Sequence, residues 1–223
     1  QLPAFFIERL SREGDLVYDP FSGRGTTAIE AGLRGRRVAA NDINPLSRVM
    51  TRPRFDPPTV SEVASRLATI PYGDSRGGSG PDLSMFYHER TEAEILSLRD
   101  YLLEREEEGS LDSIDEWIRM VATNRLTGHS PGFFSVYTLP PNQAVSPERQ
   151  AKINRERGLV PEYRDTRALI VKKTRSLLRT VTPDERKRLR AAGETGLFLS
   201  GDARETPAIP DGSVQLTVTS PPF

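Results

Sequence analysis

The feature that most constrains the fold is a strand, a glycine turn, a helix and a second strand within about 27 residues. The run LVYD at 16–19 is short and apolar, which is typical of a buried parallel strand. Residues 26–34 have helical spacing, and RRVAAND at 36–42 has the character of a second strand. Strand, helix and strand in this order form a βαβ unit, so the sequence predicts an α/β fold.

The turn between the first strand and its helix has a composition that suits ligand binding. Gly23 and Gly25 allow positive φ angles and a close approach of backbone N–H groups to a ligand. Asp19 ends the first strand, at the edge where α/β sheets bind ligands, and its charge favours a cationic or amino-bearing group. Asp42 ends the second strand, where a carboxylate can accept hydrogen bonds from ribose hydroxyls. Glycine after a strand is also typical of a structural turn, but the two acids favour a cofactor.

A second group of residues stands at the end of the sequence, TSPPF at 219–223. Pro221 and Pro222 stiffen the backbone and lack N–H donors, so the Ser220 hydroxyl and nearby carbonyls remain as acceptors. Phe223 adds a flat apolar face. This arrangement fits a planar group with an exocyclic NH₂. A proline-rich turn with a core phenylalanine fits the same letters, and only the expected position beside the first strand favours a site.

Strand signals return only near the end of the sequence, at 196–203 and 213–220. Because strands need partners, residues 1–50 and 196–223 are predicted to form one sheet. Residues 51–195 lack strand signals of comparable quality and are predicted to be an insertion.

The insertion is predicted to be mainly helical and to carry its charge unevenly. Helical periodicity covers 91–105 and 112–127, and 164–181 has the pattern of a basic helix. Residues 149–190 hold fourteen Lys and Arg against five Asp and Glu, a balance of +9, whereas 89–116 have a balance of −8. Such asymmetry fits one face for a polyanion, although a solvated helical surface would carry the same charges.

Composition argues against several classes of protein. There is no cysteine, which excludes disulfides, thiolate zinc sites and a cysteine nucleophile. His88 and His129 are the only imidazoles, so we expect no metal site. No run approaches the roughly 20 apolar residues that span a bilayer, and the start lacks the pattern of a secretory leader, so no membrane partner is expected.

Four motifs, VYDPFSGRGTT, NDIN, GDA and TSPPF, together resemble the class I S-adenosylmethionine-dependent amino-methyltransferases of DNA. The resemblance covers roughly residues 1–50 and 196–223 and implies a Rossmann-like methyltransferase sheet. In that family the first motif holds the methionine part of S-adenosyl-L-methionine. The resemblance therefore implies cofactor contacts at Asp19, Phe21, Gly23, Gly25, Thr26 and Thr27.

Further cofactor contacts follow from the same resemblance. It implies that Asp42 binds the ribose hydroxyls, with Ile43 next to the adenine, and that Asp202 of the GDA segment meets the adenine amino group. The tract before the first strand resembles the family's helix that closes over the methionine, which adds Pro3 and Phe5.

The resemblance makes Ser220, Pro221, Pro222 and Phe223 the catalytic tetrapeptide. Its serine form is associated mainly with methylation at N4 of cytosine, with N6 of adenine as the alternative. The implied mechanism is direct methyl transfer, in which Ser220 and the Pro221 carbonyl accept the amino hydrogens of a flipped base stacked on Phe223. Two alternatives remain open: a tRNA guanine-N2 methyltransferase, which Ser220 and the long insertion disfavour, and a catalytically silent nucleic-acid-binding module.

The insertion resembles a target-recognition region, and double-stranded DNA is the predicted partner. Candidate phosphate contacts in its basic helix are Lys172, Lys173, Arg175 and Arg179. A second copy of the chain and a cognate restriction endonuclease are further candidate partners, and the expected location is the cytoplasm of a bacterium or archaeon, at the nucleoid. The full family sheet has seven strands; only four are found here, so we expect a fragment of a longer protein.

Overall fold

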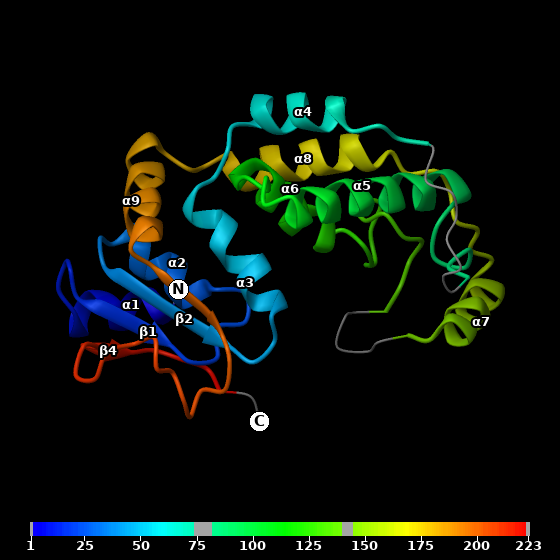
Figure 1. Ribbon diagram of the computed structural model, residues 1–223. Helices are drawn as coiled ribbons and strands as arrows, with labels where there is room; N and C mark the ends of the chain where they lie inside the picture. The colour runs from blue at the N-terminus through cyan, green and yellow to red at the C-terminus, as the bar shows by residue number, and fades with distance from the viewer. Residues whose placement is uncertain (1, 74–81, 140–144, 222–223) are drawn as a thin grey trace. The chain divides into compact units, whose positions relative to one another are not determined.

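The computed structural model describes residues 2–73, 82–139 and 145–221. The chain forms two compact units (Figure 1). We call residues 1–57 with 180–223 the sheet unit, and residues 58–179 the helical unit. Segment 180–195, which the sequence prediction assigned to the insertion, lies in the sheet unit because helix α9 (Pro183–Glu194) packs against helix α2 (Thr26–Leu33).

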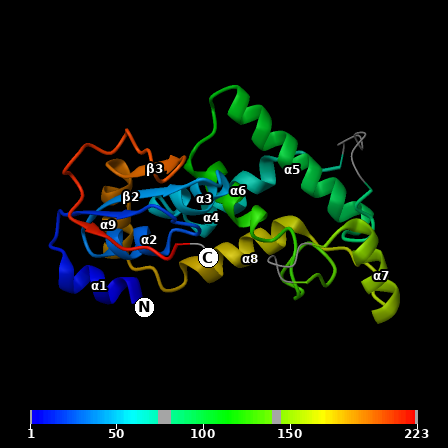
Figure 2. The same ribbon diagram turned by 90° about the horizontal axis from the view of Figure 1, so that it is seen from below.

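The sheet unit contains a parallel sheet whose described strands have the order β3-β2-β1-β4. The strands are β1 (Leu16–Asp19), β2 (Arg37–Asp42), β3 (Leu197–Ser200) and β4 (Leu216–Thr217). Val17 of β1 is in register with Val38 of β2 on one side and with Leu216 of β4 on the other. In Figure 2 the red C-terminal segment lies beside the blue first strand. The predicted α/β fold with an incomplete Rossmann-like sheet is confirmed, and the two ends of the chain share that sheet.

Helices cover the face of the sheet on which the apolar core lies. Helix α1 (Leu2–Leu10) and helix α9 both pack against α2. Helix α3 (Leu46–Thr51) continues into the 3-10 helix η1 (Arg52–Phe55), which buries Phe55 completely. The fully or nearly buried core residues are Ile7, Val17, Ala28, Ala31, Val38, Ala40, Phe55, Leu189 and Ala192. This packing fixes the carboxyl edge of β1 and β2 on a closely packed base.

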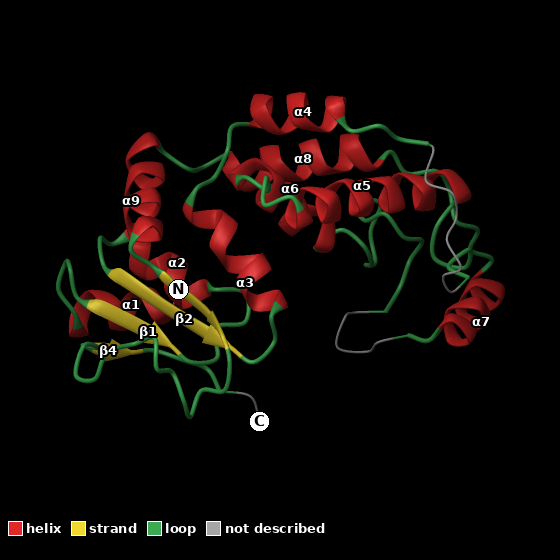
Figure 3. Cartoon of the chain, viewed as in Figure 1, coloured by secondary structure: helices red, strands yellow, loops and turns green. Residues whose placement is uncertain are grey.

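The described part of the helical unit consists of helices and loops, and the arrows of Figure 3 all fall in the sheet unit. Its helices are α4 (Val60–Thr69), α5 (Glu89–Glu107), α6 (Ser113–Thr123), α7 (Pro147–Arg157) and α8 (Thr166–Leu178). Helix α8 packs against α4, α5 and α6. Among the described residues, no helix has both the length and the apolar character that a membrane crossing requires.

A buried ion network ties three of these helices together. Asp115 of α6 is fully buried and binds Arg66 of α4 at 2.5 Å and Arg105 of α5 at 2.6 Å. Asp112 adds a second carboxylate to Arg66 at 2.7 Å. These partners raise the pKa of Arg66 above its usual value. Because a buried carboxylate is stable only when paired, the network specifies how α4, α5 and α6 dock.

Candidate active site

The carboxyl end of β1 and the segment after β4 lie side by side. The backbone N–H of Val218 donates to the carbonyl of Tyr18 at 3.0 Å. One residue further, the Thr219 hydroxyl donates to the Asp19 carboxylate at 2.6 Å. Ser220 follows Thr219 directly, so the two predicted halves of the site meet at one edge of the sheet.

The glycine turn after β1 has the backbone conformation that its sequence predicts. Asp19 is 4% exposed and accepts the backbone N–H of Phe21 at 3.1 Å. Gly23 and Gly25 both have positive φ, 50° and 75°, and Gly25 caps the N-terminus of α2. A β-carbon on Gly25 would lie 2.8 Å from the Thr51 Cβ and closer still to the rest of that side chain. The turn therefore requires glycine at position 25 on two independent grounds, its φ angle and its contact with α3.

Asp42 joins the end of β2 to the glycine turn. One carboxylate oxygen accepts the backbone N–H of Gly23 at 2.9 Å, and the other accepts the N–H of Asn44 at 2.9 Å. A carboxylate has about four acceptor sites, so both oxygens keep capacity for a further donor. Ile43, the residue after Asp42, is 74% exposed. An apolar face and a carboxylate with free acceptor sites thus adjoin each other at this edge.

Asp202 lies in the loop after β3, next to the end of β2. The N–H of Gly201 donates to the Asp42 carbonyl at 3.1 Å. Arg204 grips both Asp202 oxygens, with its Nε 3.0 Å from each and its Nη2 2.5 Å from one. These hydrogen bonds lower the pKa of Asp202 to about 2. The pairing therefore favours the ionised carboxylate, and the Asp202 side chain stays 43% exposed.

The other predicted cofactor contacts lie on helices α1 and α2. Thr26 and Thr27 open α2; Thr26 is exposed and Thr27 is buried. Pro3 and Phe5 lie in α1, which packs against α2. Phe5 is 46% exposed, and the Arg9 guanidinium lies 4.0 Å from the centroid of its ring.

The predicted catalytic tetrapeptide is described only in part. Ser220 and Pro221 are exposed beyond the end of β4. Pro222 and Phe223 lie outside the described residues. The roles predicted for these four residues therefore stay predictions; their structural support is that Ser220 directly follows Thr219, which binds Asp19.

Sequence reasoning missed three contacts that organise the site. They are the Thr219–Asp19 hydrogen bond, the Arg204–Asp202 pair and a 2.8 Å hydrogen bond between the buried Ser22 and Ser47 hydroxyls. Arg204 is two residues from Asp202, and this local spacing is the one signal that the sequence offers. The other two pairs are 200 and 25 residues apart and follow only from the folded sheet.

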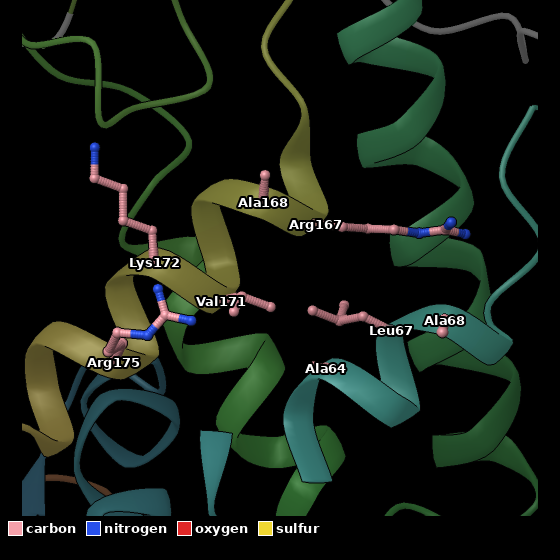
Figure 4. Close-up of a pocket in the computed structure, with 8 residues that line it drawn as sticks. All are labelled: Ala64, Leu67, Ala68, Arg167, Ala168, Val171, Lys172 and Arg175. Atoms are coloured by element: carbon pink, nitrogen blue, oxygen red, sulfur yellow. The ribbon is translucent and has the colours of Figure 1, made fainter. Parts of the chain in front are cut away.

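The basic helix predicted to bind DNA is α8, which lines a groove with α4. The groove has a volume of about 540 Å³ and is shown in Figure 4. Leu67 of α4 and Val171 of α8 point toward one another, and Lys172 and Arg175 project from α8. Arg167 is occupied elsewhere: it donates to the Ile70 carbonyl and lies 3.8 Å from the centroid of the Tyr72 ring.

The remaining two predicted phosphate contacts differ in their exposure. Lys173 is half-buried, whereas Arg179 is exposed immediately after the last residue of α8. The exposed cations of the group are therefore Lys172, Arg175 and Arg179. Within the described residues there is no cluster of three His, Asp or Glu side chains arranged to hold a metal ion.

Comparison with known proteins finds a family match for the first part of the chain. Residues 1–47, which contain the glycine turn and β2, match the family model described as DNA methylase. Over these residues the chain is therefore similar to DNA methylases. The resemblance recognised from the motifs is supported by this match.

Two relatives of this chain are methyltransferases by name. The type II methyltransferase M.MvaI of Kocuria varians is 30% identical over 122 residues, which cover 53% of this chain and 23% of that protein. The orphan methyltransferase M.BamHII of Bacillus amyloliquefaciens is 44% identical over 52 residues, 20% of each chain. The chain thus spans less than a quarter of the length of either relative. No solved structure gives a significant match.

S-adenosyl-L-methionine is the methyl donor of DNA methylases, and the described residues fit it. The space at the Gly23 α-carbon is open, because a β-carbon built there would meet no atom within 4 Å. The carboxylates of Asp19, Asp42 and Asp202 follow three neighbouring strands at one edge, which suits a ligand with a sulfonium, an amino group and ribose hydroxyls. The exposed side chain of Ile43 offers an apolar surface for a purine.

Proposed function

We propose that this chain carries the cofactor site and the start of the catalytic segment of a DNA methyltransferase that modifies an exocyclic amino group. The bond between the Thr219 hydroxyl and the Asp19 carboxylate is the observation that carries this proposal. This bond joins the motif assigned to the cofactor to the motif assigned to the target base, although its two residues are 200 positions apart in the sequence. A shared edge is what direct transfer between two bound molecules requires.

In this proposal each of three carboxylates binds a different part of the cofactor. Asp19 faces the amino group of the methionine part, Asp42 accepts from the ribose hydroxyls, and Asp202 accepts from the adenine amino group. Phe21 and Ile43 supply apolar contacts, while Thr26, Thr27, Pro3 and Phe5 complete the methionine pocket from α2 and α1. When bound, S-adenosyl-L-methionine supplies an electrophilic methyl group on its sulfonium.

The target amino group is held by the segment after β4. The Ser220 hydroxyl and the Pro221 carbonyl would accept hydrogen bonds from its two N–H groups, which favours a pyramidal nitrogen with its lone pair out of conjugation with the ring. On methylation the nitrogen would take the methyl group from the sulfonium, leave the thioether S-adenosylhomocysteine and release one amino proton to solvent. Pro222 keeps this backbone rigid and Phe223 stacks on a base that has left the duplex. The serine at position 220 favours N4 of cytosine over N6 of adenine as the target atom.

Double-stranded DNA is the proposed substrate, contacted by the exposed cations of the helical unit. Lys172, Arg175 and Arg179 meet phosphates, and the half-buried Lys173 adds positive charge beside them. In a bacterium or archaeon the DNA substrate would lie at the nucleoid, so we propose a cytoplasmic location. A second copy of the chain and a companion endonuclease are not part of the proposal, since no described contact bears on them.

The direct test is methyl transfer followed by nucleoside analysis. The protein is incubated with S-adenosylmethionine labelled in its methyl group and with duplex DNA or tRNA, and the nucleic acid is digested to nucleosides. We expect label in N4-methylcytosine from DNA, and loss of that label in Ser220→Ala with cofactor binding retained. Label in N6-methyladenine would correct the target base. Label in tRNA, or none in either nucleic acid with the cofactor bound, would overturn the proposal.

A further inference from the structure

A buried asparagine connects the two loops that carry the proposed cofactor contacts. Asn41 lies in β2 directly before Asp42 and is 1% exposed. Its side-chain amide donates to the carbonyl of Gly201 at 3.0 Å, and its own backbone carbonyl accepts the N–H of Ser22 at 2.9 Å. Ser22 belongs to the glycine turn, and Gly201 immediately precedes Asp202.

The loop after β3 is held to β2 through both backbone groups of one residue, Gly201. The N–H of Gly201 donates to the Asp42 carbonyl at 3.1 Å, and its carbonyl accepts the Asn41 amide. Both polar groups of Gly201 are therefore fixed to the strand that supplies the Asp42 carboxylate. Asp202 is the next residue along the chain, so its main chain starts from a point fixed against β2.

Within the described residues, the Asn41 side chain makes one hydrogen bond, the one to the Gly201 carbonyl. The Asn41 Oδ1 is buried and makes no hydrogen bond there, although an unpaired buried acceptor costs stability. An apolar side chain of the same size would avoid that cost. Packing alone therefore does not explain an asparagine at position 41, and the better explanation is that its one hydrogen bond fixes the position of Gly201.

Asp202 itself is oriented by a neighbour in its own loop. Arg204 holds both carboxylate oxygens, with its Nε at 3.0 Å from each. Arg204 thus sets the direction of the carboxylate relative to the loop, whereas Asn41 sets the loop relative to β2. The two contacts together fix where the Asp202 charge lies with respect to Asp42.

We propose that Asn41 is a positioning residue, which sets the loop of Asp202 so that this carboxylate reads the exocyclic amino group of the cofactor's adenine. This inference rests on the proposed cofactor site. It requires that removing the Asn41 amide weakens discrimination for the amino group without abolishing binding of the rest of the nucleoside. A residue that only supports the fold would weaken every ligand alike.

The experiment uses two ligands that differ in one group. S-adenosylhomocysteine carries the adenine amino group, and its analogue with hydrogen at that position lacks it. Calorimetry on the full chain gives both affinities for wild type and for Asn41→Leu, which keeps the size of the side chain and the backbone bond to Ser22 but removes the donor. Asn154→Leu is the matched control, because the Asn154 amide also donates to a backbone carbonyl, that of Met85 at 2.7 Å, but lies in the helical unit and contacts none of the proposed cofactor residues.

Wild type and Asn154→Leu are expected to prefer the amino-bearing ligand by about tenfold or more, the usual contribution of a hydrogen bond to a charged group. In Asn41→Leu this preference falls below about threefold, while affinity for the analogue changes by less than about threefold. Adding Asp202→Ala to Asn41→Leu changes the preference no further, because the asparagine acts through that carboxylate.

Three results would overturn the inference. An unchanged preference in Asn41→Leu with equal weakening of both ligands assigns Asn41 a purely structural role. Equal binding of both ligands by wild type shows that Asp202 does not read the amino group, while the cofactor site itself stands. Binding of neither ligand by wild type removes the proposed function together with this inference. If Asn41→Leu does not fold, Asn41→Ser removes the same bond with a smaller side chain and is judged by the same preference.

Discussion

The glycine turn contains two glycines, and comparing their alanine variants separates the energy of a positive φ angle from the energy of a steric clash. Gly23 and Gly25 both have positive φ, 50° and 75°. A β-carbon at Gly23 would meet no atom within 4 Å, whereas one at Gly25 would overlap the side chain of Thr51. Gly23→Ala therefore changes only backbone energy, and Gly25→Ala changes backbone energy and packing.

The magnitudes follow from these two contributions. A left-handed conformation costs an L-residue roughly 1–2 kcal/mol, and this is the whole decrease in unfolding free energy expected for Gly23→Ala. Overpacking adds typically about 1–3 kcal/mol, so Gly25→Ala is expected to lower the unfolding free energy by about 2–5 kcal/mol. Replacing Thr51 by glycine in the Gly25→Ala background removes the overlapping atoms and recovers most of the difference between the two single variants.

Urea unfolding followed separately in each unit measures the effect. The single tryptophan, Trp117, is buried in the helical unit, so its fluorescence serves as an internal control that neither glycine variant shifts. Hydrogen exchange of the amides in β1 and α2 reports the sheet unit. Equal decreases for Gly23→Ala and Gly25→Ala would refute the reasoning, since the overlap with Thr51 would then carry no energy.

Three further predictions concern charged residues. Asp115→Ala is expected to lower the unfolding free energy by about 3–5 kcal/mol, because Arg66 and Arg105 lose their buried carboxylate partner. Tryptophan fluorescence in urea measures this free energy, and a decrease below about 1 kcal/mol would contradict the prediction. Arg204→Ala raises the pKa of Asp202 from about 2 toward 3.8. Cofactor affinity that depends on the ionised carboxylate is present in both proteins above about pH 5, and as the pH falls it is lost at a higher pH in the variant. Carboxyl-carbon NMR follows the titration, and an unchanged pKa contradicts the pairing. Replacing Lys172 and Arg175 by alanine is expected to reduce the slope of log DNA affinity against log salt concentration by about 0.9 for each phosphate that is no longer neutralised. An unchanged slope in binding titrations would mean that these side chains of α8 face solvent and do not contact DNA.

The local parts of the sheet could be predicted from sequence because their signals are local. The apolar run at 16–19, the positive-φ glycines and the helix at 26–33 depend on neighbouring residues, and the structure reproduces them closely. The strand predicted at 213–220 shrinks to two residues, Leu216–Thr217, at the edge of the described sheet. Strand length at an edge depends on pairing, which the residue pattern alone does not report.

Helix α7 shows why parts of the insertion could not be predicted. Its one buried residue is Gln150, so it has no apolar stripe from which a period could be read. The helix docks through amides instead: Gln150 donates to the Tyr137 carbonyl at 2.9 Å, and Asn154 donates to the Met85 carbonyl at 2.7 Å. Contacts of this kind depend on loops that are distant in sequence, and they leave no periodic signal.

The candidate site was predictable to the level of which residues occupy the edge. Asp19, Asp42 and Ser220 follow strand ends, and strand ends can be read from the sequence. The contacts among side chains could not be read, because Thr219 reaches Asp19 only once β4 has paired with β1. The assignment of roles to these residues therefore came from the family motifs, whereas their proximity came from the fold.

The central claim, that one site joins the glycine turn to the segment after β4, is tested most directly by NMR. A ¹⁵N-labelled chain is titrated with S-adenosylhomocysteine, and amide shifts are mapped along the sequence. The account predicts saturable shifts at Gly23 and Gly25 together with Ser220, all with one dissociation constant. Shifts at the two glycines with Ser220 unmoved, or no saturable shift at either end, would contradict it.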